Sequence, residues 1–208
     1  MNYTELKTNI EDICELTFTD DQLAMFTKQA EQKIYNAVQI PALRKNVTGT
    51  MTASNVYLSV PTDFLYVYSL AVIDGSGNYT FLLNKDVNFV REAYPAATPT
   101  GLPKHYAVFD DTTFILGPTP DSTYTFELHY KYRPDSLTAG SDSGTTWLST
   151  NAPDALLYGT LVEAATFLKV PEEGGQYEQR FIAAVAALKK LGEGYGARDE
   201  ARYDINRS

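Results

Sequence analysis

The chain has 208 residues, of which 44% are hydrophobic and 21% are charged, and its formal net charge is −9. This length and composition are typical of one globular domain, or of two small ones that share a boundary. The negative charge argues against binding to phosphate backbones or anionic membranes, because both need clusters of Lys and Arg. We also find no basic segment followed by an apolar run, so we expect no signal peptide and no membrane anchor, with synthesis in a cytoplasm.

The first forty residues predict two helices. Thr4 is a favourable N-cap for the first, whose apolar residues recur at helical spacing at Leu6, Ile10 and Ile13. The second is expected to start at Thr19, whose side chain can form a capping box with Gln22. Pro41 is expected to stop it.

From about residue 43 the hydrophobic period changes to two, which predicts strands. The candidate strands cover 55–60, 64–73, 79–83, 105–109, 114–116 and 123–132. A hairpin turn is expected at 74–77 and a short helix at 86–94. In the strand 123–132, the apolar side chains of Tyr124, Phe126, Leu128 and Tyr130 should share one face, opposite Thr125, Glu127, His129 and Lys131.

Helix is expected to resume after Asn151, with Pro153 in its first turn. The run from Pro171 to Gly175 is predicted to break it before a last long helix that fades after Gly192. The predicted fold class is α+β: a helical bundle formed by N- and C-terminal helices, with an inserted antiparallel β-rich domain. Its expected parts are a helical half at 1–42, the β-rich domain at 43–149, a second helical half at 150–192 and an extended C-terminal arm at 193–208.

The C-terminal stretch differs in charge from the rest of the chain. Residues 189–208 hold five basic and four acidic side chains, whereas residues 1–188 hold 12 basic and 22 acidic ones. The stretch is interpreted either as a frayed terminus or as an arm that becomes ordered on a partner. In the second case the candidate anchors are Tyr195, Arg198, Arg202, Tyr203 and Arg207.

Residue types that carry chemistry are sparse. The two histidines, His105 and His129, fall in separate predicted strands, and the single cysteine, Cys14, is expected to be a small buried hydrophobe. The carboxylate pairs at 20–21, 110–111 and 172–173 are interpreted as helix starts and a turn. Aromatic side chains on the strands could stack bases or sugars, but the basic residues of a single-strand binder do not alternate with them. We therefore expect no catalytic residue, metal or cofactor.

Several segments, in order along nearly the whole chain, resemble the head-to-tail adaptor proteins of short-tailed phages, the tail tubular protein A type. They include the helix opening at Tyr3-Thr4-Glu5-Leu6 and the strand ending in Leu58-Ser59-Val60-Pro61. Further matching segments are Gly101-Leu102-Pro103-Lys104-His105-Tyr106, Phe114-Ile115-Leu116-Gly117-Pro118-Thr119-Pro120-Asp121, Tyr130-Lys131-Tyr132-Arg133-Pro134, Thr146-Trp147-Leu148 and Ala155-Leu156-Leu157-Tyr158-Gly159-Thr160.

This resemblance implies a structural virion protein at the head–tail junction, without enzymatic activity. It implies a twelve-subunit ring that binds the portal protein and the tail nozzle protein, and through which DNA is ejected without specific binding. It also gives the segment 193–208 a role in docking to the portal. The alternatives are a tail-completion or stopper protein of another phage class, or a carbohydrate-binding or lytic envelope module in the β-rich part.

Overall fold

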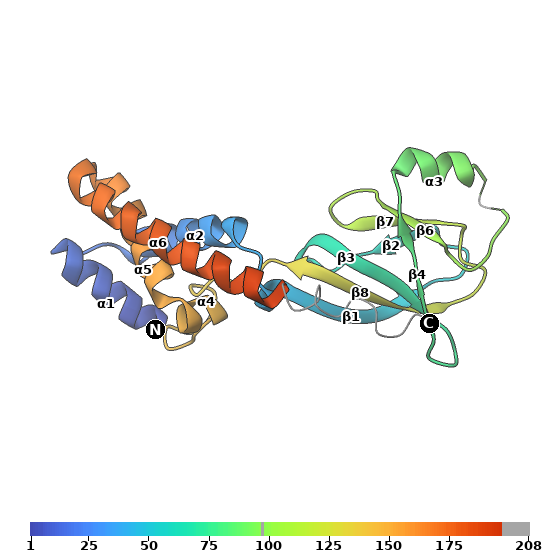
Figure 1. Cartoon of the computed structure of the whole chain (residues 1–208), viewed down its shortest axis with the longest axis horizontal. Helices are drawn as coiled ribbons and strands as arrows, with labels where there is room; N and C mark the ends of the chain where they lie inside the picture. Colours follow the sequence, from blue (N-terminus) through green and yellow to red (C-terminus); the bar gives the residue numbers. More distant parts are fainter. Residues whose placement is uncertain (97, 197–208) are drawn as a thin grey trace. The chain divides into compact units, whose positions relative to one another are not determined.

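The computed structural model describes residues 1–96 and 98–196, with side chains up to residue 192 (Figure 1). The chain divides into two compact units. The helical unit comprises residues 1–42 and the chain from Asp135 onward, and the β unit comprises residues 43–134. The predicted α+β class is confirmed. Residues 135–149, which the sequence grouped with the β-rich part, make their contacts in the helical unit, where the backbone N–H of Thr4 donates to Asp142 at 3.0 Å.

The two N-terminal helices begin at capping boxes. α1 (Tyr3–Cys14) is capped by Asn2, so the predicted cap at Thr4 is wrong. The Asn2 side chain accepts from the Glu5 N–H at 2.8 Å, and the Glu5 carboxylate accepts from the Asn2 N–H at 3.0 Å. α2 (Asp20–Ala37) starts at Thr19 with the predicted capping box to Gln22. A short 3₁₀ turn, Pro41–Leu43, leads into the β unit.

The helix α5 (Pro153–Leu168) is the centre of the helical unit, because it packs against α1, α2, α4 (Trp147–Asn151) and α6 (Pro171–Gly196). Its buried side chains lie around much of its circumference, as expected for a helix surrounded by others. At Gly159, an added Cβ would lie 2.9 Å from the Phe181 ring and 3.1 Å from the Ala30 Cβ. The absence of a side chain there lets three helices approach closely.

The break between the last two helices is shorter than predicted. α5 ends at Leu168 and is capped by Lys169, which has φ of 60°, and α6 begins two residues after this cap at Pro171. The predicted break over 171–175 is therefore wrong. Proline has no N–H and is accommodated at a first helical turn, and the two following glutamates stabilise the positive end of the helix. The helix also continues past Gly192 to Gly196.

The β unit contains two four-stranded sheets. Sheet A is antiparallel and has the order β1 (Arg44–Met51), β8 (Tyr124–Tyr132), β3 (Phe64–Ile73) and β4 (Tyr79–Phe81). Sheet B has the order β2 (Tyr57–Ser59), β7 (Thr113–Gly117), β6 (His105–Val108) and β5 (Leu83–Asn84). The β5–β6 pair is parallel and the other pairs are antiparallel.

The predicted strand 79–83 is divided between the two sheets. Tyr79–Phe81 pairs with β3 in sheet A, whereas Leu83–Asn84 pairs with β6 in sheet B. Between them, the buried Leu82 donates its N–H to the Leu70 carbonyl at 2.9 Å. The crossing between sheets therefore takes place at a residue that contributes to the common core.

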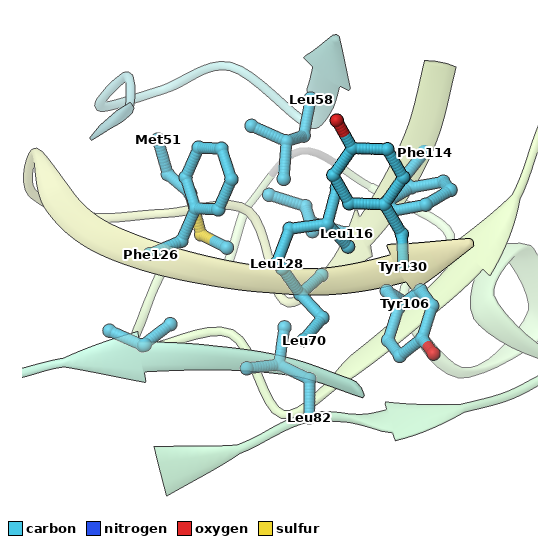
Figure 2. Close-up of a cluster of buried hydrophobic side chains, with 11 residues drawn as sticks. Met51, Leu58, Leu70, Leu82, Tyr106, Phe114, Leu116, Phe126, Leu128 and Tyr130 are labelled. Carbon is cyan, nitrogen blue, oxygen red and sulfur yellow. The ribbon is translucent and has the colours of Figure 1, made fainter. Parts of the chain in front are cut away.

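The core of the β unit is built from both sheets (Figure 2). Leu70, Phe126 and Leu128 of sheet A pack in one cluster with Phe114 and Leu116 of sheet B. The predicted apolar face of β8 is therefore confirmed. Side chains on the opposite face of sheet B, together with Val90 of α3 (Val87–Ala93), form a second, smaller cluster. Sheet B is thus covered on both faces, by sheet A and by α3.

The chain enters and leaves the β unit on neighbouring strands. Arg44, the first residue of β1, pairs with Lys131 near the end of β8. Asp63 joins the two strands to the start of β3, because its carboxylate contacts Lys45 Nζ at 2.5 Å and accepts from the Tyr130 hydroxyl at 2.8 Å. Among the described residues, no helix is long and apolar enough to cross a membrane.

Candidate interaction surface

The side chains predicted to form the docking arm lie outside the part of the chain that the structure describes. Tyr195 belongs by its backbone to the last turn of α6, and its side chain is outside the described residues. Arg198, Arg202, Tyr203 and Arg207 also lie outside the described residues. Their role in docking stays a prediction.

The two histidines lie on different sheets. His105 in β6 has its Nδ1 3.0 Å from the Tyr94 hydroxyl and its ring against Phe89. Burial lowers the pKa of His105, and the neighbouring charges of Lys85 and Lys104 act in the same direction. His105 is therefore a neutral side chain that links α3 to sheet B. His129 lies on the outward face of β8.

The remaining candidates for chemistry have structural roles. Asp110 accepts hydrogen bonds from Thr112 in the turn between β6 and β7, and these bonds lower the Asp110 pKa. Cys14 is partly buried, and this burial raises the pKa of its thiol, with a further contribution from Glu173. A thiol with a raised pKa is a poor nucleophile. Within the described ranges there is no group of three or more metal-ligating side chains.

The most distinctive surface of the β unit lies on the outward face of sheet A. We call it the aromatic–cationic face and define it by Arg44 of β1, Tyr66 and Tyr68 of β3, and His129 and Lys131 of β8. The Arg44 guanidinium lies 4.8 Å from the centre of the Tyr68 ring, and Lys131 Nζ lies 5.7 Å from that of Tyr66. The Tyr68 and His129 ring centres are 5.1 Å apart. Each tyrosine ring thus has a cation over it, and the electrostatic attraction between cation and ring stabilises the positions of both side chains.

The two tyrosines of this face also contact each other directly. Their rings meet edge to face with centres 5.2 Å apart, and their hydroxyl oxygens are 3.2 Å apart. Burial, followed by the hydrogen bond with Tyr68, raises the pKa of Tyr66 to about 12. The phenol of Tyr66 is therefore neutral at physiological pH and retains a proton to donate.

Strand alternation places both tyrosines on one face, in a stretch of β3 whose pairing with β8 is irregular. The register between β3 and β8 shifts between Phe64 and Tyr66 and again between Val67 and Ser69. Tyr66 and Tyr68 are two residues apart, and side chains at this spacing in a strand share a face. The Asp63 contacts described above fix the same ends of β1, β3 and β8.

This combination of side chains is not visible as a pattern in the sequence. The two tyrosines lie on β3, whereas Arg44 and Lys131 come from the strands β1 and β8. The sequence does show His129 and Lys131 alternating on the polar face of 123–132. Recognising the face would also have needed the pairing of β1 with β8, which no local pattern gives.

Comparisons with known proteins place the chain in one family. A family model described as SU10 adaptor protein matches residues 1–206, nearly the whole chain. The search of curated proteins finds no match.

Proposed function

The chain belongs to the SU10 adaptor protein family and is therefore a phage adaptor and a virion component, and we propose from this premise that it forms the ring that joins the phage head to the tail. In this proposal the subunits bind the portal protein on one side and the tail nozzle protein on the other. Twelve copies enclose a channel through which DNA leaves, and the ring acts by shape and assembly without catalysis.

The match over residues 1–206 carries the proposal, because it includes both the helical unit and the inserted β unit. The division into two units suits a protein that must contact more than one partner, since each unit has its own core. The two surfaces of such a connector can then be built from different units.

The charge distribution supports passage of DNA without retention. The helical unit holds 18 acidic and 10 basic side chains, whereas the β unit holds 8 acidic and 7 basic ones. A channel lined by net negative charge repels phosphate and keeps DNA mobile. We therefore assign the lumen-facing role to surfaces of the helical unit.

The direct test is negative-stain imaging of the purified protein, alone and mixed with the portal protein of the same phage. We expect portal rings to acquire an additional layer with about twelvefold symmetry. Monomers in the sample without portal are compatible with the proposal, because a ring can assemble on its partner. Portal rings that stay bare at saturating adaptor concentrations would refute portal binding.

A truncation tests the docking arm. A chain that ends after residue 192 should attach to portal rings more weakly than the full chain. A full-length variant in which Arg198, Arg202 and Arg207 are replaced by Gln separates the contribution of charge from that of length. Equal attachment of the truncated and full chains in a co-sedimentation assay would show that the arm does not dock.

A further inference from the structure

The aromatic–cationic face has the composition and rigidity of a protein-binding surface. Tyr66 and Tyr68 are 39% and 36% exposed, although their rings are already held by Arg44, His129 and Lys131. Tyr and Arg are the residue types that contribute most to binding at interfaces. Because the rings are fixed before binding, a partner that packs on them loses little side-chain entropy.

The charge of the face selects an acidic partner. The two charged members of the face, Arg44 and Lys131, are both cationic, and the exposed Arg44 lies at its edge. The nearest carboxylate on the same face of β8 is Glu127, which accepts from the Tyr79 hydroxyl at 3.2 Å. A complementary surface should therefore offer carboxylates together with apolar side chains that pack on the tyrosines.

The helical unit carries a surface of this kind at the end of α1. We call it the acidic–apolar end and define it by Asp12, Ile13, Glu15 and Leu16. Ile13 and Leu16 are 42% and 48% exposed, and Asp12 and Glu15 are exposed beside them. Glu173 at the start of α6 adds negative charge here, since it acts electrostatically on Cys14. Ile13 recurs at helical spacing with Leu6 and Ile10, but those two side chains are buried whereas Ile13 is exposed.

A nucleic acid fits the aromatic–cationic face less well than a protein does. Binding to phosphates relies on several Lys or Arg side chains that displace counterions. Here one of the two cations, Lys131, is 7% exposed, and the chain as a whole has a net charge of −9. Duplex DNA in a channel would also not present bases for stacking on Tyr66 and Tyr68.

We propose that the aromatic–cationic face of one copy of the chain binds the acidic–apolar end of α1 of a second copy. The contact joins two different patches, so its repetition closes a ring when the rotation between neighbouring copies is a whole fraction of a full turn. This inference rests on the proposed ring and identifies the contact between its subunits. Arg44 and His129 face carboxylates of the neighbour, and Ile13 and Leu16 of the neighbour cover the two tyrosine rings.

Disulfide trapping between two single-cysteine variants tests the contact. Both carry Cys14→Ser, which removes the single natural thiol; one also carries Tyr68→Cys and the other Leu16→Cys. When the two are mixed under mild oxidation, we expect the mixed dimer to form about tenfold faster than either homodimer, because docking raises the effective thiol concentration. Trapping is measured by non-reducing gel, both for the protein alone and after addition to portal rings.

A matched control replaces the reactive position on the β unit. Leu83→Cys places a thiol on an exposed residue of sheet B, outside the aromatic–cationic face. Mixed with Leu16→Cys, it should form dimers at the background rate. Adding Arg44→Glu to the Tyr68→Cys variant should also reduce trapping to background, and Glu15→Lys in the partner should restore part of it.

The outcomes separate this inference from the proposed function. In one outcome, portal rings gain an adaptor layer but the Tyr68→Cys and Leu16→Cys variants show no preferential trapping. This outcome would overturn the contact and leave the adaptor role intact. Portal rings that stay bare would refute portal binding. Disulfide trapping in the protein without portal would then still show whether two copies of the chain make the proposed contact. Binding of a single-stranded oligonucleotide at physiological salt, lost on Arg44→Glu, would show that a nucleic acid occupies the face instead.

Discussion

Asp63 is the residue that secures the point where the chain enters and leaves the β unit. Its carboxylate holds Lys45 of β1 and Tyr130 of β8, and its carbonyl accepts from the Arg133 N–H at 2.8 Å. Partial burial acts to raise the pKa of Asp63, but the hydrogen bonds from Lys45 and Tyr130 outweigh it, so the pKa lies below its ordinary value of 3.8. Tyr130 shows the reciprocal effect: burial, followed by this hydrogen bond, raises its pKa to about 12.

We expect Asp63→Asn to reduce the free energy of unfolding by about 1 kcal/mol at pH 7, because the charge-assisted bonds are lost. A lowered pKa in the folded state stabilises the protein above the unfolded-state value, and this stability is lost as the pH falls through the folded-state value. The wild type should therefore lose more stability than the variant below about pH 4. Urea unfolding at pH 7 and at pH 3 measures both effects.

A double variant provides the control for Asp63. Lys45→Gln combined with Asp63→Asn should cost less than the sum of the two single changes, because the two side chains interact directly. If the losses in the free energy of unfolding are additive, the interaction between Lys45 and Asp63 does not contribute to stability.

Glu31 has the opposite pH dependence. Its buried carboxylate on α2 accepts from the Leu137 N–H at 2.9 Å and so ties the segment after β8 to the helical unit. Burial raises its pKa above 4.5, against the smaller opposing effects of the Ser136 and Leu137 hydrogen bonds and the Lys28 charge. The contribution of Glu31 to stability is thus fully present below pH 4.5 and is lost as the pH rises through the raised value.

Glu31→Gln should remove this pH dependence and retain the acceptor for Leu137, so the variant should be at least as stable as the wild type at pH 7. Glu31→Ala should instead lose about 1–3 kcal/mol near pH 4, because the Leu137 N–H is left buried without its acceptor, and its difference from the wild type should narrow as the pH rises. Thermal unfolding between pH 4 and pH 8 compares the three proteins. A Gln variant that follows the pH profile of the wild type would assign the dependence to another group.

At the scale of elements, the helical unit depends on close approach at Gly159 in α5. An alanine there would place its Cβ 2.9 Å from Phe181 and 3.1 Å from the Ala30 Cβ. We expect Gly159→Ala to lower the free energy of unfolding by about 1–3 kcal/mol through overpacking. The matched control is Gly175→Ala in α6, where nothing lies within 4 Å of an added Cβ.

Gly175→Ala should raise the free energy of unfolding by about 0.5–1 kcal/mol, because alanine is the better helix former. The opposite signs of the two changes, measured by thermal unfolding, distinguish packing from helix propensity. A stabilised Gly159→Ala variant would contradict the packing of α5 between α2 and α6.

The elements differ in how far local sequence determines them. Thr19 with Gln22, the turn at 74–77 and the alternation in β8 are local signals, and the structure confirms them. The Pro171–Gly175 run was misread because proline and glycine signal both breaks and helix starts, and tertiary packing decides between them. The transfer of the chain between sheets at Leu82 depends on pairing with distant strands, so local sequence does not predict it. The aromatic–cationic face depends in the same way on the pairing of β1 and β3 with β8.

At the scale of the whole molecule, the β unit has the properties of an independent domain. It has its own core, and its first and last strands pair with each other. A fragment comprising residues 43–134 should therefore fold alone and unfold cooperatively. Circular dichroism and a dispersed amide NMR spectrum would verify this, whereas a fragment with the spectrum of an unfolded chain would show that the helical unit is needed.

The adjacent entry and exit of the β unit have an evolutionary consequence. Because both connections to the helical unit lie at the paired ends of β1 and β8, one β unit can be replaced by another whose ends are equally close. The helical unit then keeps its packing around α5 while the insert changes. A lineage of such proteins can in this way adapt one surface to new partners by recombination, while the surface that serves an unchanged partner stays under separate selection.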